Sequence, residues 1–118
     1  MTIRDICGYL DAEVLCGAEA LDREVHSACG SDMMSDVLAF VKNQAVLLTG
    51  LVNAQVVRTA LMMDIVCIVF VRSKKPGPEI VAFAEENGLT VLTTDLRMYE
   101  ACGKLYAAGL KGNGEIHE

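Results

Sequence analysis

The stretch that decides the fold is residues 45–71, AVLLTGLVNAQVVRTALMMDIVCIVFV. It opens with a short apolar run, is broken by Thr49-Gly50, and continues from Asn53 into a segment whose apolar residues follow helical spacing. The closing run, 65–71, is apolar and rich in β-branched residues, which is typical of a strand covered on both faces. The stretch therefore predicts a β-α-β unit with two parallel strands and a right-handed crossover.

The sequence on both sides of this unit continues the alternation of helices and strands. Such alternation indicates an α/β fold, a three-layer α/β/α sandwich with a mostly parallel sheet. The order of the first two strands in that sheet stays open. The further predicted elements are helices at 3–10, 33–41, 79–86 and from Thr94-Asp95 to about 108, and strands at 14–16, 25–29 and 89–93.

The composition limits the size of the protein and the kinds of partner it can have. With 118 residues, 53% of them hydrophobic, the chain can form one domain with one core. We expect this domain to span 1–110 and a flexible tail to span 111–118. The formal net charge of −6 argues against nucleic acid or an anionic membrane as the main partner. We recognise neither a membrane span nor a signal peptide, so we expect a cytoplasmic protein.

The motifs that would indicate catalysis or metal binding are missing from the sequence. It has no phosphate loop G-x-x-x-x-G-K-[ST], no G-x-G-x-x-G loop and no nucleophile elbow G-x-S-x-G. The five cysteines lack C-x-x-C spacing and are predicted to be reduced residues of the core. We therefore expect no enzyme activity, no cofactor and no metal. An enzyme or metal carrier that uses Cys29, Cys67 or Cys102 stays open as an alternative.

Polar residues gather where three predicted strands end and helices begin. Parallel strands end at the same edge of a sheet, where ligands bind, and helix N-termini attract anions. These residues could hold a small anionic or nucleotide ligand, with Arg72 as a counter-charge. The alternative is that they only cap helices. The candidate ligand-binding residues are Ser31, Asp32, Thr49, Gly50, Asn53, Arg72, Thr94 and Asp95.

The last predicted helix is apolar over most of its circumference. Such a helix needs two packing partners, and its own sheet is only one of them. The second could be another copy of the chain, so the sequence predicts a homodimer. The predicted interface is one stripe of this helix, formed by Leu96, Tyr99, Gly103, Tyr106 and Leu110.

The order and spacing of these segments resemble the DRTGG domain family over roughly residues 1–108. The resemblance is carried by LLTGLVNAQVVRTALMMDIVCIVFV at 47–71 and KKPGPEIVAFAEENGLTVLTTDLRMYEACGKLY at 74–106, with LDREV at 21–25 and GSDMMSDV at 30–37. The signature that names the family is absent in literal form, and TGLVN at 49–53 stands near its place.

The resemblance implies a fold similar to the amino-terminal domain of HPr kinase and to the first domain of the Mur ligases. DRTGG domains occur beside CBS domains in regulated pyrophosphatases, as regulatory or dimerising modules, and catalysis lies in other domains. HPr kinase activity is not expected, because the phosphate loop of that kinase belongs to a separate domain. Stand-alone copies occur near iron-hydrogenase genes, which makes a redox enzyme a candidate partner. We therefore expect a non-catalytic regulatory or ligand-sensing module, with a pure protein–protein interaction module as the alternative.

Overall fold

A computed structural model gives the structure of the protein and describes residues 1–40 and 44–112. Its strands form a single sheet in the order β1-β5-β4-β3-β2. β2 to β5 are parallel, and β1 pairs antiparallel with β5 at one edge of the sheet. This confirms the predicted α/β class with a mostly parallel sheet. The strands are β1 (Glu13–Cys16), β2 (Ser27–Gly30), β3 (Ala45–Thr49), β4 (Ile65–Phe70) and β5 (Thr90–Thr93).

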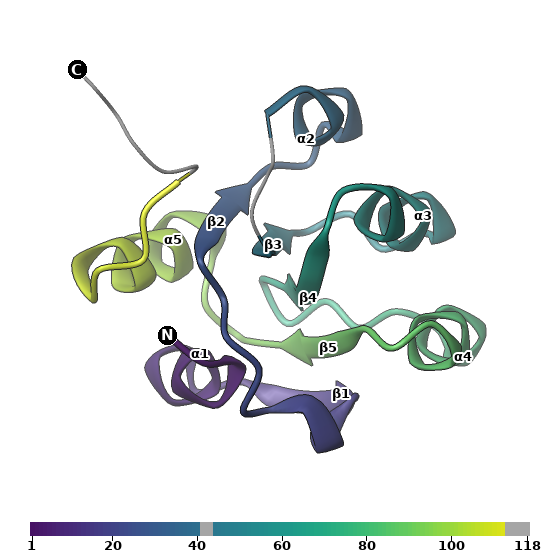
Figure 1. Ribbon diagram of the computed structural model, residues 1–118, viewed down its shortest axis with the longest axis horizontal. Coiled ribbons are helices and arrows are strands. Elements are labelled where there is room, and N and C mark those ends of the chain that lie inside the picture. Colours follow the sequence, from purple (N-terminus) through teal and green to yellow (C-terminus); the bar gives the residue numbers. More distant parts are fainter. Residues whose placement is uncertain (41–43, 113–118) are drawn as a thin grey trace.

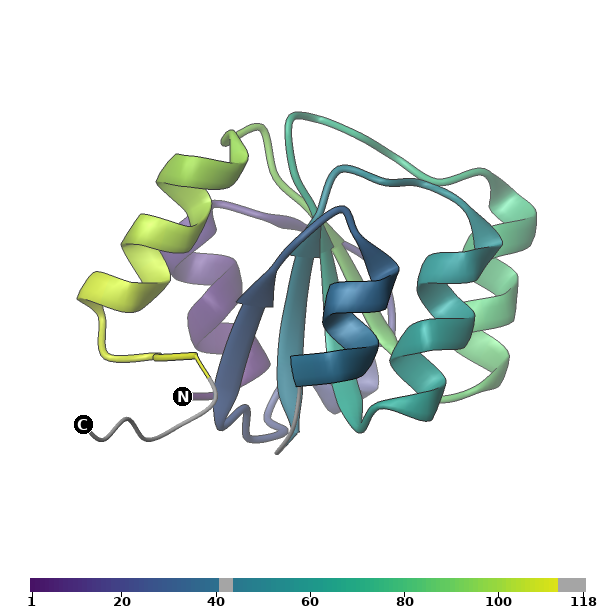
Figure 2. The same ribbon diagram turned by 90° about the horizontal axis from the view of Figure 1, so that it is seen from above.

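Helices cover both faces of the sheet and complete the three predicted layers. Figure 1 shows α1 and α5 on one face and α2, α3 and α4 on the other, and Figure 2 shows the same layers from above. A short 3-10 helix, η1 (Ala18–Ala20), follows β1. The α-helices are α1 (Ile3–Leu10), α2 (Met34–Phe40), α3 (Ala54–Met62), α4 (Pro78–Glu86) and α5 (Met98–Ala107).

The predicted β-α-β unit is present as β3, α3 and β4. Every residue of β3 and β4 is buried, because both strands lie inside the sheet and helices cover both of its faces. Asn53 caps α3 as predicted, since its side-chain oxygen accepts a hydrogen bond from the backbone N–H of Val56 at 3.2 Å. The two strands and the helix cap that were predicted from the local sequence are therefore confirmed.

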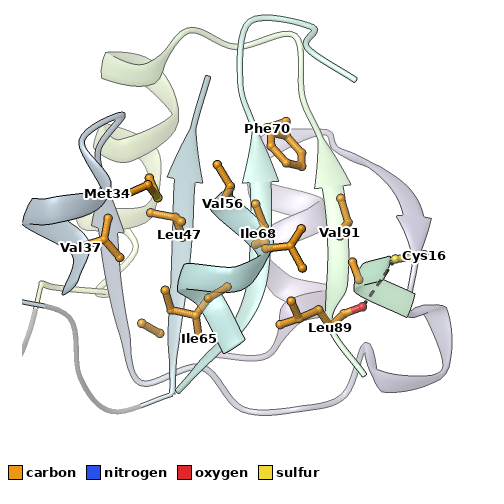
Figure 3. Packing of buried hydrophobic residues seen from close by; sticks show 14 residues of the cluster. Cys16, Met34, Val37, Leu47, Val56, Ile65, Ile68, Phe70, Leu89 and Val91 are labelled. Carbon is orange, nitrogen blue, oxygen red and sulfur yellow. Dashed lines mark hydrogen bonds between the residues drawn. The ribbon is translucent and has the colours of Figure 1, made fainter. Parts of the chain in front are cut away.

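Alternate residues of the strands divide the core into two layers. Leu47, Ile68, Phe70 and Val91 pack toward α2, α3 and α4, as Figure 3 shows for this cluster. Their sequence neighbours belong to a second cluster that packs against α1 and α5, and they include Val46, Leu48, Cys67, Val69 and Leu92. The continuous apolar strands thus contribute side chains to both core layers, as expected for a sheet with helices on both faces.

Some predicted element boundaries are wrong, and tertiary contacts explain them. β2 begins at Ser27 instead of Val25, because the backbone N–H of Val25 donates to Met1 O at 2.7 Å and its side chain is buried on the α1 side. Helix α2 was expected to reach Val41, which lies outside the described residues. The predicted tail, 111–118, begins beside β2, where the carbonyl of Lys111 accepts from the N–H of Ala28; residues 113–118 lie outside the described residues.

The last helix does not begin at Thr94-Asp95 as predicted. α5 begins at Met98, and its N-cap residue, Arg97, makes no side-chain capping bond. The Thr94 hydroxyl instead donates to Leu10 O at 2.7 Å, and Asp95 accepts from the Ser73 hydroxyl at 2.7 Å. Both side chains are therefore engaged with other elements.

The predicted interface stripe on the last helix is divided between surface and core. Tyr99, Gly103 and Tyr106 are exposed, whereas Leu110 is buried and Leu96 is half-buried against the same core cluster. Leu96 and Leu110 therefore pack within the single chain. Within residues 1–40 and 44–112, none of the helices has the length and apolar character needed to cross a membrane.

Candidate functional site

The parallel arrangement brings four strand ends to one edge of the sheet, which we call the carboxyl edge. In Figure 2 the arrowheads of the parallel strands point to this edge. Backbone hydrogen bonds continue the ladder one residue past the strands and fix the segments that follow. These bonds run from Ser31 N to Leu48 O, from Val71 N to Thr49 O and from Thr94 N to Phe70 O, each at 3.0 Å.

Asp32 joins the ends of β2 and β3. One oxygen of its carboxylate, Oδ1, accepts from the Thr49 hydroxyl and from the Gly50 backbone N–H, both at 2.8 Å. The Thr49 oxygen in turn accepts from the N–H of Leu51 at 3.1 Å. The carboxylate is therefore held through one oxygen and acts as a cross-link between strand ends, not as a free cap of α2.

Arg72 follows β4 and lies against the same corner. Its backbone is left-handed, with φ of 59°, and its N–H donates to Leu96 O at 2.8 Å. A Cβ atom at Gly50 would lie 2.6 Å from Nη2 of the Arg72 guanidinium. A larger side chain at position 50 would therefore displace the guanidinium, and glycine lets it approach the backbone.

Ser73, after β4, and Thr93, the last residue of β5, lie beside this corner and are not among the predicted ligand-binding residues. Ser73 also has a left-handed backbone, with φ of 60°, and its hydroxyl holds Asp95. The Thr93 hydroxyl donates to the Lys74 carbonyl at 2.7 Å. Ser73 lies within the basic stretch 72–75, and no local pattern in the sequence marks its hydroxyl.

The structure brings together only part of the predicted ligand-binding set. Asp32, Thr49, Gly50 and Arg72 form one group at the ends of β2, β3 and β4, which we call the edge cluster. Of the others, Ser31 accepts from the N–H of Met33 at 2.9 Å, Asn53 caps α3, Asp95 is held by Ser73, and Thr94 is buried with its hydroxyl turned to Leu10.

Among the described residues, the guanidinium of Arg72 at the carboxyl edge has no carboxylate partner. Lys75, three residues beyond Arg72, pairs with Glu13 at 3.4 Å. Arg72 takes part in none of the ion pairs within the described residues. Since the guanidinium carries donors in a planar fork and is always charged, this side chain is suited to an oxyanion.

The cysteines offer little support for thiol chemistry. All five are free. Burial raises the pKa values of Cys29, Cys67 and Cys102, which disfavours the thiolate that would attack or bind metal. In the described part of the chain, no three His, Cys, Asp or Glu side chains gather as a potential metal site.

The chain is a mostly parallel α/β domain with polar groups at the carboxyl edge, the place where sheets of this kind bind ligands. The DRTGG domain model matches residues 5–108, so the chain belongs to the DRTGG domain family. The resemblance seen in the sequence is thereby confirmed. None of the curated proteins compared with this chain matches it.

A solved structure with the same fold is the crystal structure of the CBS and DRTGG domains of the regulatory region of Clostridium perfringens pyrophosphatase, complexed with the activator diadenosine tetraphosphate. The TM-score is 0.72 and the sequence identity is 19%. The similarity covers 88% of this chain and 45% of that chain. The present chain thus corresponds to less than half of that regulatory region.

Proposed function

We propose that this protein is a non-catalytic regulatory module of the cytoplasm that senses a small anionic or nucleotide ligand at its carboxyl edge. The observation that carries the proposal is the guanidinium of Arg72, which lies close to Gly50, whose N–H donates to Asp32, and which has no ion-pair partner among the described residues. The regulatory role in the family member from Clostridium perfringens supports the same class of function. Five free cysteines are in keeping with a reducing compartment.

The groups of the edge cluster would bind different parts of the ligand. The guanidinium of Arg72 would bind an anionic oxygen of the ligand through paired N–H donors. Asp32 uses Oδ1 for the protein and would turn its other oxygen to a hydroxyl of the ligand. Anion and hydroxyl groups occur together in nucleotides, which is why we place nucleotides among the ligands to be tested.

A thermal-shift screen tests this proposal. The purified protein is heated with phosphate, sulfate, acetyl phosphate, ADP, ATP and diadenosine tetraphosphate, each in a concentration series. A ligand at about 100 times its dissociation constant adds about 2.7 kcal/mol to the free energy of unfolding. For a domain of this size we expect the melting temperature to rise by several degrees.

Two arginine variants locate the bound ligand. Arg72→Ala removes the guanidinium of the edge cluster, and we expect it to abolish the shift. Arg58→Ala removes an exposed arginine of α3 and should leave the shift unchanged. If none of the anions stabilises the protein, or if Arg72→Ala keeps the full shift, the carboxyl edge is not the sensing site.

A pure interaction module, for instance for a redox enzyme, is the second candidate. The observation that favours it is the exposure of two tyrosines on α5, 86% for Tyr99 and 60% for Tyr106. Under this function the edge cluster would only tie strand ends together. A negative ligand screen, combined with saturable binding of a purified partner enzyme that is lost in Tyr99→Ala, would favour it over ligand sensing.

A further inference from the structure

The segment that leads from β5 into α5 is held by the residues that follow β4. The backbone N–H of Arg72 donates to Leu96 O at 2.8 Å, and that of Ser73 donates to Thr94 O at 2.9 Å. The Ser73 hydroxyl donates to Asp95 Oδ1 at 2.7 Å. In Figure 2 the two connecting segments run side by side at the carboxyl edge, where these bonds join them. We call the three hydrogen bonds the β4–α5 tie.

The start of α5 depends on this tie because the helix has no side-chain cap of its own. α1 and α3 begin with Thr2 and Asn53, whose side chains accept from the backbone of the helix. Arg97, at the N-cap of α5, makes no such bond among the described residues. Thr94 is fixed by bonds to β4 and α1, so the tie positions the two residues beyond it, 95–96, which lead to the helix.

The tie holds two residues in an unfavourable backbone conformation. Arg72 and Ser73 are consecutive, carry side chains, and are both left-handed, with φ of 59° and 60°. Such a conformation is disfavoured for residues with a Cβ atom and persists only where surrounding contacts hold it. Loss of part of the tie should therefore release the pair to ordinary backbone angles and leave the start of α5 unsupported. The segment thus has a held and a released arrangement.

One residue of the tie also belongs to the edge cluster. The guanidinium of Arg72 lies close to Gly50, and the backbone N–H of the same residue donates to Leu96 O. An anion bound by this guanidinium restrains the side chain and, through it, the backbone of residue 72. A ligand that binds the held arrangement more tightly than the released one increases the population of the held arrangement.

We infer that the β4–α5 tie transmits occupancy of the edge cluster to α5, so that a bound anion orders the first turns of this helix. The inference rests on the proposed function and adds an output to it. The first turn of α5 carries Tyr99, which at 86% exposure is the most exposed of the large hydrophobic side chains in the described residues. Binding at the carboxyl edge therefore controls the order of an exposed apolar surface outside the binding site.

Residue-resolved hydrogen exchange without ligand tests the tie itself. The reporter is the amide of Ala101, which donates to Arg97 O at 2.9 Å in the first turn of α5. Ser73→Val removes the hydroxyl and places a β-branched residue where the backbone is left-handed, so we expect this amide to exchange about tenfold faster. Ser73→Gly also lacks the hydroxyl but adopts the left-handed conformation freely, and should stay within about threefold of the wild type.

The amides of the second turn of α3 are the control for global stability. This helix is capped by its own Asn53 and makes none of the three bonds of the tie. Acceleration by Ser73→Val that is equally large in α3 and α5 reports general destabilisation and overturns the inference. Equal exchange at Ala101 in Ser73→Val and Ser73→Gly overturns it as well, because the left-handed backbone then has no influence on α5.

The same measurement with ligand separates the inference from the proposed function. The probe is whichever of phosphate, sulfate, acetyl phosphate, ADP, ATP and diadenosine tetraphosphate gives the largest Arg72-dependent thermal shift. In the wild type we expect exchange at Ala101 to slow about fivefold more than exchange in α3, and in Ser73→Val to slow only as much as in α3. If the anion binds and the wild type shows no such excess, the inference fails and the proposed function stands. If none of the anions binds, both fail.

Discussion

At the scale of single residues, buried hydroxyl groups show how the fold uses polar side chains. Thr90 and Thr94 are buried and donate to carbonyls of distant segments, Gly17 and Leu10. Thr59 is equally buried on α3, yet its hydroxyl has no hydrogen-bond partner among the described residues. A buried hydroxyl without a partner reduces stability, whereas a paired one contributes to it.

This contrast predicts opposite effects for two similar substitutions. Thr59→Val removes an unpaired hydroxyl and should leave the free energy of unfolding unchanged or raise it by up to about 1 kcal/mol. Thr90→Val removes one of two hydrogen bonds to Gly17 O, which still accepts from the Ala20 N–H at 3.0 Å, and should lower the free energy by about 0.5–1.5 kcal/mol. Urea denaturation measures both. A larger loss for Thr59→Val than for Thr90→Val would contradict this account.

The carboxylate of Asp32 should be structural as well as ligand-binding. Asp32→Ala leaves the Thr49 hydroxyl and the Gly50 N–H without their acceptor, so we expect a loss of about 1–3 kcal/mol. Asp36→Ala, which removes an exposed carboxylate without a hydrogen bond in the described residues, should change stability by less than about 0.5 kcal/mol. Equal values in urea denaturation would show that the cross-link contributes nothing.

At the scale of elements, α1 shows how far local sequence can define a helix. Thr2 and Asp5 form a complete capping box: Asp5 accepts from the Thr2 backbone N–H at 2.9 Å, and Thr2 accepts from the Asp5 N–H at 3.1 Å. The backbone N–H of Thr2, and then its hydroxyl, lower the pKa of the Asp5 carboxyl from its usual 3.8.

The lowered pKa of Asp5 predicts a dependence of stability on pH. A carboxyl whose pKa falls on folding stabilises the fold above its unfolded value, and this contribution is lost as the pH falls through the folded value. Wild-type stability should therefore fall between about pH 5 and pH 2, and Asp5→Asn should lose less over that interval. Urea midpoints at both ends test this. If Asp36→Asn flattens the dependence as strongly, the capping box is not its source.

The elements that local sequence placed wrongly are those whose polar residues bond to distant segments. Asn53 was correctly predicted as a cap because it bonds within its own helix. Thr94 and Asp95 have equally good capping chemistry, yet the Thr94 hydroxyl donates to Leu10 O while accepting from the Leu96 N–H, and Asp95 accepts from Ser73. A competing partner that is far along the chain cannot be recognised from spacing alone.

At the scale of the whole molecule, dimerisation should link stability to protein concentration. An association that involves only the folded state raises its apparent stability. If the homodimer predicted from the sequence forms, the melting temperature of the wild type should rise by a few degrees from about 5 to 500 µM, and that of Gly103→Gln, a variant in the predicted interface stripe, should stay constant. Calorimetry over this range measures it. A constant value for the wild type would speak against a dimer.

The sequence by itself determined the central β-α-β unit, the α/β class, the first helix and the family. The elements depend on apolar periodicity or on bonds between near neighbours, such as those between Val56 and Asn53 or between Thr2 and Asp5. Both kinds of signal lie within a few residues and can be read directly.

Only the tertiary structure decided which polar residues meet. It joined Asp32 to Thr49 and Gly50, placed Arg72 over Gly50, and turned Thr94 away toward Leu10. It also decided that Leu96 and Leu110 pack into the core while Tyr99 and Tyr106 stay exposed. These outcomes depend on strand order and on how deeply a helix sits on the sheet, which are set by contacts across the whole chain and not by neighbouring residues.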